Sequence, residues 1–217
     1  MASGSLHVLV TAGPTREHLD PVRYLSNESS GRMGFEIARA AVEAGHRATL
    51  IAGPVHLETP PGVERVDVVS ALDMLAALEE HFPRADAIYM AAAVGDFRPR
   101  ERLDGKWKKK EDGGAPAVLE LVENPDLLRT ITRDKGDRKV IAFALETADG
   151  ARRAAAKLVR KNADWIVLNG ASALNAPESS VTVFDADGAL WSAEGCPKRE
   201  TAARLIQLIG PHGPTPS

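Results

Sequence analysis

The sequence LHVLVT at residues 6–11 and the sequence GRMGFEIARAAVEA at residues 31–44 decide the fold class. The first is an apolar run of strand length, and the second repeats small and apolar residues at helical spacing until Gly45 ends it. The polar segment between them, residues 12–30, is long for a connection within a compact domain, and such loops are usually functional. A strand, a long loop and a helix in this order predict the start of an α/β domain.

The same alternation continues along the chain and predicts a Rossmann-like α/β fold. A capping box at Ser70–Asp73 and the hairpin signal Asp187-Gly188 mark two boundaries. We expect a mostly parallel sheet with helices on both faces and a small antiparallel or edge appendage. Further strands are expected at residues 48–52, 63–69, 87–92, 117–122, 139–144, 165–168, 181–184 and 189–192, and helices at 70–81, 124–132, 149–161 and 197–209.

The length and the net charge of the chain limit its domain organisation and the partners it can bind. The 217 residues are expected to form one domain, 1–217, with residues 97–123 as a dimerisation appendage and 210–217 as a tail. The chain has 27 Lys and Arg residues and 30 Asp and Glu residues, so its net charge predicts no binding to nucleic acid or to an anionic membrane. No apolar run approaches the roughly 18–20 residues of a membrane span. Residues 1–5 do not resemble a signal peptide, so we expect a cytoplasmic protein.

The first candidate site is Ser29-Ser-Gly-Arg-Met-Gly34, where the expected helix begins. A helix N-terminus offers free N–H groups to anions, and glycine lets a phosphate approach the backbone. The alternative is an ordinary capped helix whose small residues allow close packing. The spacing is neither G-x-G-x-x-G nor that of a Walker A loop, which sets aside the common dinucleotide and P-loop interpretations.

The second candidate is Asp96, just beyond the apolar strand expected at residues 87–92. Ligands of open α/β sheets bind at that edge, and one carboxylate beside phosphates is a common Mg²⁺ ligand. The alternative is an Asx turn or a helix cap. Other metal chemistry is not predicted, because Cys196 is the single cysteine and the six histidines form no ligand spacing.

Two groups of lysines are further candidates. Lys106-Trp-Lys-Lys-Lys110 places four lysines in five residues, which can neutralise a polyphosphate. A solvated loop, or an edge strand protected from aggregation, is the alternative. Lys157 and Lys161 are four residues apart and therefore share one face of a helix, either as ligands of an anion or as solvent-facing decoration.

Taken in order, these segments resemble the phosphopantothenate–cysteine ligase family, also called phosphopantothenoylcysteine synthetases, and in particular its bacterial CTP-dependent type. The resemblance spans about residues 8–210, and the combination of segments is specific although no single one is. The segments that carry it are Thr11–Glu17, Asp20–Gly34, Ala91–Arg98, Lys106–Lys109, Glu123–Leu127, Ala142–Thr147 and Lys157–Asn169.

The resemblance implies a two-step ligation in coenzyme A biosynthesis. The carboxylate of 4′-phosphopantothenate attacks the α-phosphate of CTP, pyrophosphate leaves, and the amine of cysteine then displaces CMP from the acyl-cytidylate to form an amide. The family also implies Mg²⁺, a homodimer, and a separate or fused phosphopantothenoylcysteine decarboxylase as a partner. Such chemistry needs cations and positioning rather than a nucleophilic side chain.

Site residues follow from the resemblance, position by position. Asn27 and Lys106 match the catalytic positions, Asn27 and Arg23 the substrate-binding positions, and Asp96 the metal ligand. Two residues depart from the family pattern, because Gly95 stands where alanine is usual and Trp107 where an aliphatic residue is usual. The implied nucleotide-binding residues are Gly13, Ser30, Gly31, Met90, Ala91, Ala92, Asp96, Lys106, Pro125, Asp126, Leu127, Leu128, Phe143, Lys157 and Lys161.

Two other classes share this fold. A short-chain-type NAD(P)-dependent reductase needs Tyr-x-x-x-Lys, whereas Tyr24 and Tyr89 are followed four residues later by Glu28 and Ala93. A non-catalytic nucleotide-binding module would bind a nucleotide but release no pyrophosphate when given both substrates.

Overall fold

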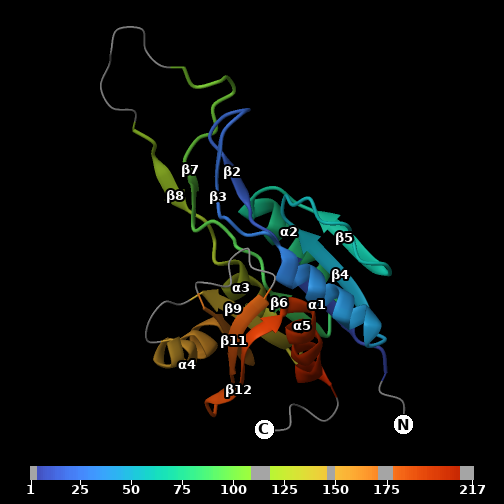
Figure 1. The fold of residues 1–217 in the computed structure, drawn as a ribbon. Helices are drawn as coiled ribbons and strands as arrows, with labels where there is room; N and C mark the ends of the chain where they lie inside the picture. Colours follow the sequence, from blue (N-terminus) through green and yellow to red (C-terminus); the bar gives the residue numbers. More distant parts are fainter. Residues whose placement is uncertain (1–3, 109–117, 146–149, 171–177, 211–217) are drawn as a thin grey trace.

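An eight-stranded mixed sheet forms the centre of the molecule in the computed structural model, which describes residues 4–108, 118–145, 150–170 and 178–210 (Figure 1). The strand order is β12-β11-β10-β9-β6-β1-β4-β5, with β10 through β5 paired in parallel and β11 and β12 antiparallel. This confirms the expected Rossmann-like class. The strands are β1 His7–Ala12, β4 Arg47–Ala52, β5 Val63–Asp67, β6 Ala87–Met90, β9 Lys139–Leu145, β10 Trp165–Asn169, β11 Glu178–Phe184 and β12 Ala189–Pro197.

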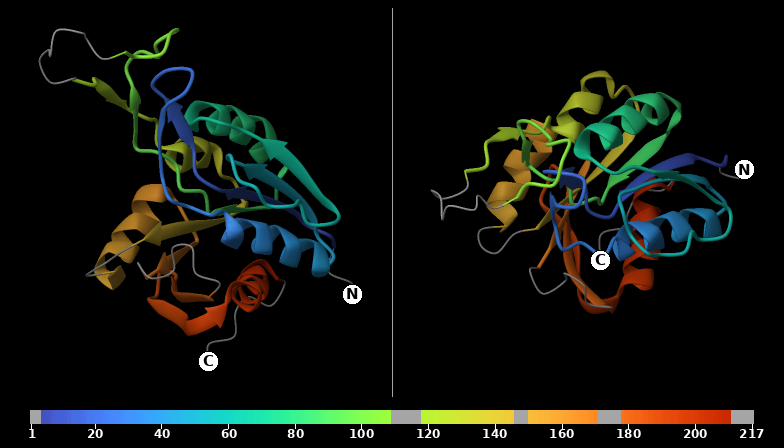
Figure 2. Two further views of the ribbon diagram at one scale, coloured as in Figure 1. Left: turned by 45° about the horizontal axis from the view of Figure 1, so that its top comes forward. Right: turned by 90° about the horizontal axis from the view of Figure 1, so that it is seen from above.

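Helices cover both faces of the sheet (Figure 2). α1 (Arg32–Glu43) and α5 (Lys198–Ile206) pack on one face, and α2 (Ala71–His81), α3 (Leu127–Ile131) and α4 (Gly150–Lys161) lie on the other. Short 3₁₀ turns at Phe82–Arg84, Thr132–Asp134 and Gln207–Ile209 continue α2, α3 and α5. None of the described helices combines the length and apolar character that crossing a membrane requires.

The alternation along β1 explains the two core layers. Val8 and Val10 belong to the cluster under α1 and α5, whereas Leu9, between them, belongs to the cluster under α2 and α3. All three are fully buried, as expected for a parallel strand covered on both faces. Tyr89 on β6 adds a polar tie, because its hydroxyl donates to the Leu205 carbonyl of α5 at 2.8 Å.

Several local predictions are confirmed, and several boundaries differ. Ser70 and Asp73 form the capping box of α2, and the last two strands form the antiparallel pair indicated by Asp187-Gly188. The helix expected from residue 124 begins only at Leu127, because the Asp126 side chain accepts from the Arg129 amide and acts as its cap. Asp149, the expected cap of α4, lies outside the described residues.

Two antiparallel pairs form where the sequence predicted only one strand, at residues 117–122, and otherwise irregular loops. β2 (Arg16–His18) pairs with β3 (Tyr24–Ser26) inside the supposed loop 12–30, and β7 (Phe97–Pro99) pairs with β8 (Leu121–Glu123). The strand expected at 117–122 is therefore shorter and later than predicted. β2, β3 and β7 have three residues each and lie mostly at the surface, so no hydrophobic alternation marks them.

The two pairs join into one projection, which we call the extension (residues 16–26, 97–108 and 118–123). Figure 1 shows it reaching away from the carboxyl ends of the central strands. The Leu103 amide donates to the Leu19 carbonyl at 2.9 Å and thereby ties the two parts together. The appendage expected at 97–123 thus shares its structure with the earlier segment 16–26.

Candidate functional site

The candidate site lies where the sheet reverses its direction of winding. The chain leaves β1 toward β4 and β5 on one side, and leaves β6 toward β9 and β10 on the other. Ligands of open α/β sheets bind in the crevice at the carboxyl ends of such strands. Two cavities open there, of about 580 and 220 Å³, and share Ala92, Phe143 and Ala144 as a common wall.

The first, larger cavity collects most of the predicted nucleotide-binding residues. α4 contributes Lys157 and Lys161 together, as their spacing predicted, and the 125–128 turn lies opposite. Gly95, Glu123, Asn124 and Arg160 also line it and were not predicted as site residues. The predicted residues that line it are Met90, Ala92, Asp96, Pro125, Asp126, Leu127, Leu128, Phe143, Lys157 and Lys161.

An ion pair between Lys161 and Asp126 crosses this cavity from α4 to the turn before α3. Burial raises the pKa of Asp126, but the hydrogen bond and the charge of Lys161 outweigh it and hold that pKa below its ordinary value. The carboxylate therefore stays charged at neutral pH, and Lys161 is held at the cavity wall. An incoming anion can recruit the lysine by competing with Asp126.

Asn124 fixes the relation between the turn and Asp96. Its side-chain amide donates to the Gly95 carbonyl at 2.8 Å, and its backbone N–H donates to the Asp96 carbonyl at 2.8 Å. The Gly95 amide in turn donates to the Thr15 hydroxyl at 2.9 Å. The glycine that departs from the family pattern is therefore anchored on both sides. Pro125 and Asp126 were implied to bind the nucleotide, but Asn124 was interpreted only as part of a helix start, and its role as a brace became visible in three dimensions.

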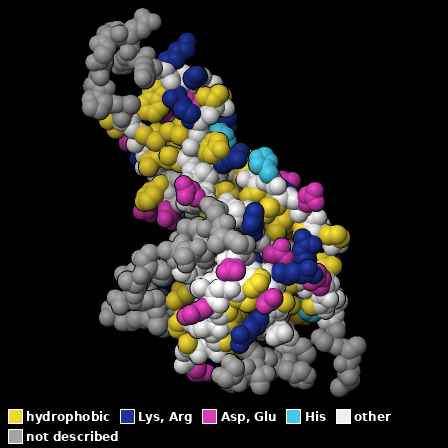
Figure 3. Space-filling model, viewed as in Figure 1, with side chains coloured by type: hydrophobic (Ala, Val, Ile, Leu, Met, Phe, Trp, Pro, Cys, Tyr) yellow, Lys and Arg dark blue, Asp and Glu magenta, His cyan; other side chains and the backbone are white. Residues whose placement is uncertain are grey.

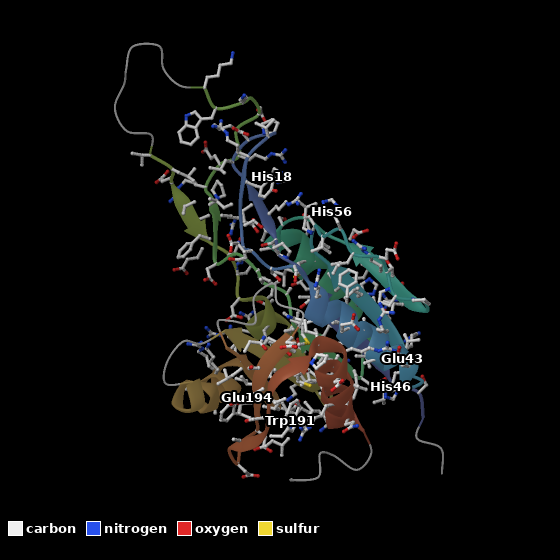
Figure 4. All side chains as sticks on the ribbon, viewed as in Figure 1. His18, Glu43, His46, His56, Trp191 and Glu194 are labelled. Atoms are coloured by element: carbon white, nitrogen blue, oxygen red, sulfur yellow. The ribbon has the colours of Figure 1, made fainter. Side chains whose placement is uncertain are left out.

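Asp96 is exposed and is one of the residues that line the first cavity. Among the described residues, no group of three or more His, Cys, Asp or Glu side chains could hold a metal ion. Figure 4 accordingly shows His18, His46 and His56 on separate parts of the molecule. A single carboxylate is compatible with Mg²⁺, because this ion keeps several waters and takes its other ligands from phosphates.

The second cavity lies at the start of α1 and contains Ser30, Gly31 and Ala91 of the predicted set. Gly31 has φ +76°, and a Cβ there would lie 3.1 Å from the Gly13 amide nitrogen. Gly13, with φ +79°, lines neither cavity and instead packs behind Gly31. The two glycines let the β1 loop and the helix start lie in contact, so Gly13 shapes the site from behind.

Asn27 lies beside this second cavity. Its side-chain amide donates to the Ala93 carbonyl at 3.0 Å, and Ala93 lines the cavity. The neighbouring Ser26 hydroxyl donates to the Thr15 carbonyl at 2.7 Å and fastens the end of β3 to the loop after β1. Asn27 is exposed, so a ligand can reach its side chain.

Arg23 and Lys106 lie on the extension and line neither cavity. Arg23 donates to the carboxylate of Asp20 and to the Trp107 carbonyl, and the Trp107 amide donates to Asp20 at 3.1 Å. Burial of Asp20 raises its pKa, but these hydrogen bonds outweigh it and hold the pKa well below the ordinary range. Asp20 therefore fastens the loop that carries Lys106. Lys109 and Lys110 lie outside the described residues.

An open, mostly parallel α/β sheet with two joined cavities at its switch point, bordered by lysines and a helix N-terminus, defines an α/β domain of the nucleotide-binding kind. More specifically, the chain belongs to the DNA/pantothenate metabolism flavoprotein C-terminal domain family, whose profile matches residues 4–211. This confirms the family indicated by the sequence segments.

Curated relatives carry the name coenzyme A biosynthesis bifunctional protein CoaBC. The Vibrio cholerae protein is 43% identical over 186 residues, which are 83% of this chain and 46% of the relative. The Bacillus subtilis protein is 43% identical over 208 residues, which are 94% of this chain and 50% of the relative. The chain therefore spans about half the length of the curated relatives it matches.

Solved structures agree with this family. The crystal structure of the C-terminal domain of a coenzyme A biosynthesis bifunctional protein CoaBC is 36% identical, with a TM-score of 0.81, and the match covers 95% of this chain and 94% of that one. A DNA/pantothenate metabolism flavoprotein from Streptococcus pneumoniae has a TM-score of 0.83 at 21% identity, covering 96% and 100%, and supports the fold.

Proposed function

We propose that this chain is a phosphopantothenate–cysteine ligase that joins 4′-phosphopantothenate and cysteine through an acyl-cytidylate, in the cytoplasm. The observation that carries the proposal is the first cavity, where most of the implied nucleotide residues meet in one place. Family membership and the coenzyme A biosynthesis named in its relatives support the same activity. A decarboxylase partner, fused or separate, accords with the bifunctional names of relatives twice as long.

The side chains of the first cavity suit nucleotide activation. Lys157 and Lys161 offer positive charge to phosphate oxygens, which lowers the cost of charge building up as pyrophosphate leaves. Asp96 would hold Mg²⁺, which supplies Lewis-acid polarisation of the phosphates when bound. Asn27, beside the second cavity, is a neutral donor and acceptor for the acyl-nucleotide.

A homodimer is part of the proposal. Figure 3 shows hydrophobic side chains gathered on the extension, and Val22, Phe97 and Val118 are 61%, 49% and 83% exposed there. Such a concentration is typical of a surface that packs on another protein. Because Lys106 lines neither cavity of its own chain, dimerisation through the extension offers it a route to a cavity of the partner. Light scattering near 23 kDa at micromolar concentration would exclude this arrangement.

Pyrophosphate release tests the ligase against the alternatives. With 4′-phosphopantothenate and cysteine present, we expect pyrophosphate to be released faster from CTP than from ATP. Backbone groups would recognise the edge of the cytosine base, and a wrong base that leaves one buried hydrogen bond unmade would bind more weakly by roughly 1–3 kcal/mol. Equal turnover of CTP and ATP would defeat the preference. Nucleotide binding with no pyrophosphate would favour a non-catalytic module, and hydride transfer from NAD(P)H would favour a reductase.

The two half-reactions test the roles of Lys106 and Asn27. Lys106→Gln should abolish pyrophosphate release even without cysteine, because it removes a charge needed at the phosphates. Asn27→Asp should retain some activation but fail to form the amide, because a carboxylate is repelled by the phosphodiester. Removing one preorganised donor typically costs ~10²–10³ in rate. Arg102→Gln, at an exposed position of the same segment but outside the lysine cluster, is the matched control.

Following pyrophosphate and CMP separately, with and without cysteine, distinguishes the outcomes. Equal loss of pyrophosphate release in both variants would show that the division of roles is wrong. Wild-type rates in Lys106→Gln would show that the lysines form only a solvated loop.

A further inference from the structure

The end of α4 is held against α3 at two points, and both points involve Lys161. Its ammonium group is paired with Asp126, which caps the start of α3. Its backbone carbonyl accepts from the hydroxyl of Thr132, at the other end of α3, at 3.1 Å. Thr132 is only 3% exposed, and its hydroxyl also lies 2.8 Å from the Leu128 carbonyl, so its single proton is shared by two acceptors. Lys161, which lines the first cavity, is therefore held both at its backbone and at its charge.

Asn162, the residue after Lys161, ends α4 in an uncommon backbone conformation. Its φ of +49° lies in the left-handed region, and it is the one non-glycine residue with a positive φ in the described part of the chain. The Asn162 amide donates to the Val159 carbonyl at 3.2 Å. The Ala163 amide donates to the Leu158 carbonyl at 3.1 Å, and these two bonds are the usual ones where a helix ends on a left-handed residue. Glycine would close the same turn with less strain.

The side chain of Asn162 supplies a bond that glycine would lack. Its amide nitrogen donates to the Thr132 carbonyl at 3.0 Å and fastens the end of α4 to the end of α3. Thr132 and Asn162 thus donate to each other's segments, and we call this pair the clasp. Because backbone conformations of higher energy persist where the surrounding structure has a use for them, the clasp points to a role beyond ending a helix.

We propose that Thr132 and Asn162 are positioning residues for the nucleotide, and that they act by fixing the backbone of Lys161 at the wall of the first cavity. The inference rests on the proposed ligase function, which takes this cavity as the nucleotide site. A lysine ammonium group sits on a flexible four-carbon stem, so its place depends on where the backbone that carries it is held. With the end of α4 fixed, less ordering of the site opposes the binding of a phosphate.

Asn162→Gly tests the clasp without straining the fold, because glycine adopts a positive φ freely. We expect the affinity for CTP, measured by calorimetry, to fall about threefold, which is the effect of losing one hydrogen bond of ordinary strength. Burial raises the pKa of Asp126 and Lys161 lowers it, so a looser Lys161 should let that pKa rise in a carboxyl NMR titration. Thr132→Val should change both quantities in the same direction, whereas Thr132→Ser, which keeps the hydroxyl, should leave them as in the wild type.

Lys135→Met is the matched control. Lys135 pairs with Asp164 at 2.8 Å and ties the chain after α3 to the chain after α4, through a bond that does not involve Lys161. Its loss should lower the free energy of unfolding but leave the affinity for CTP unchanged. An equal fall in CTP affinity in Lys135→Met and Asn162→Gly would show a general loosening of the two segments and would overturn the proposal.

A double-mutant cycle with Lys161→Met shows whether the clasp acts through that lysine. In the Lys161→Met background, Asn162→Gly should leave the affinity for CTP unchanged. A further fall in that background, or no fall in Asn162→Gly alone, overturns the proposal. If the cycle behaves as expected but the wild-type chain forms no amide, the positioning role stands and the ligase function fails. If Asn162→Gly binds CTP and forms the amide as the wild type does, the ligase function stands and the positioning role fails.

Discussion

Replacing Gly34 with alanine should separate α1 from β1 and disturb the second cavity. A Cβ at Gly34 would lie 2.5 Å from the Ala12 Cβ and 2.9 Å from the Thr11 carbonyl oxygen. Carbon atoms in favourable contact are ~3.5–4.0 Å apart, so the helix must retreat from the strand by about 1 Å. Because the helix start carries Ser30 and Gly31, that retreat moves the cavity wall.

Two opposing energies set the size of the effect. Alanine favours a helix over glycine by about 1 kcal/mol, whereas overpacking a buried contact costs about 1–3 kcal/mol. We expect a net destabilisation of up to about 2 kcal/mol. The rate of pyrophosphate release should fall more than this loss of stability suggests, because a misplacement of ~1 Å in a site can lower a rate ~10²-fold.

Urea unfolding and the rate of pyrophosphate release measure the two effects on the same protein. Gly4→Ala is the control, because it makes the same chemical change where no atom lies within 4 Å. A Gly34→Ala protein that is more stable than wild type and equally active would refute the reasoning, since helix propensity would then outweigh the contact.

Three further predictions concern groups outside this contact. Tyr89→Phe should lower the free energy of unfolding by roughly 0.5–1.5 kcal/mol, because it removes the buried hydrogen bond to the Leu205 carbonyl, and an unchanged urea midpoint would contradict this. The pKa of Asp20 is lower in the folded state than the unfolded value of ~3.9, so its carboxylate stabilises the fold above that pH, and this stabilisation is lost as the pH falls toward the folded pKa. The free energy of unfolding of Asp20→Asn should therefore fall less steeply at acid pH than that of the wild type. Equal slopes for the two proteins would contradict this. Lys161→Met should raise the pKa of Asp126, followed by carboxyl NMR titration, and weaken CTP binding about tenfold; a shift in neither quantity would show that the ion pair has no part in the site.

The sequence could predict the central sheet because its signals are local. Parallel strands buried on both faces must be continuously apolar, and β1 and β6 are nearly so. The capping box of α2 and the Asp187-Gly188 hairpin were equally readable, since each depends on a few adjacent residues. The one-turn spacing of Lys157 and Lys161 predicted their common face on α4, and the first cavity confirms that they meet there.

Tertiary structure decided what depends on pairing between distant segments. The short strands β2, β3 and β7 carry no alternation of their own. β2 pairs with β3 and β7 pairs with β8, and the hydrogen bond from the Leu103 amide to the Leu19 carbonyl ties the two pairs into the extension. Lys198 follows a proline at an unremarkable helix start, and only the fold of β10, β11 and α1 around it shows a buried cation in a cavity. Local patterns record backbone preference and burial, whereas a binding site is made by side chains that the folded sheet brings together from several elements.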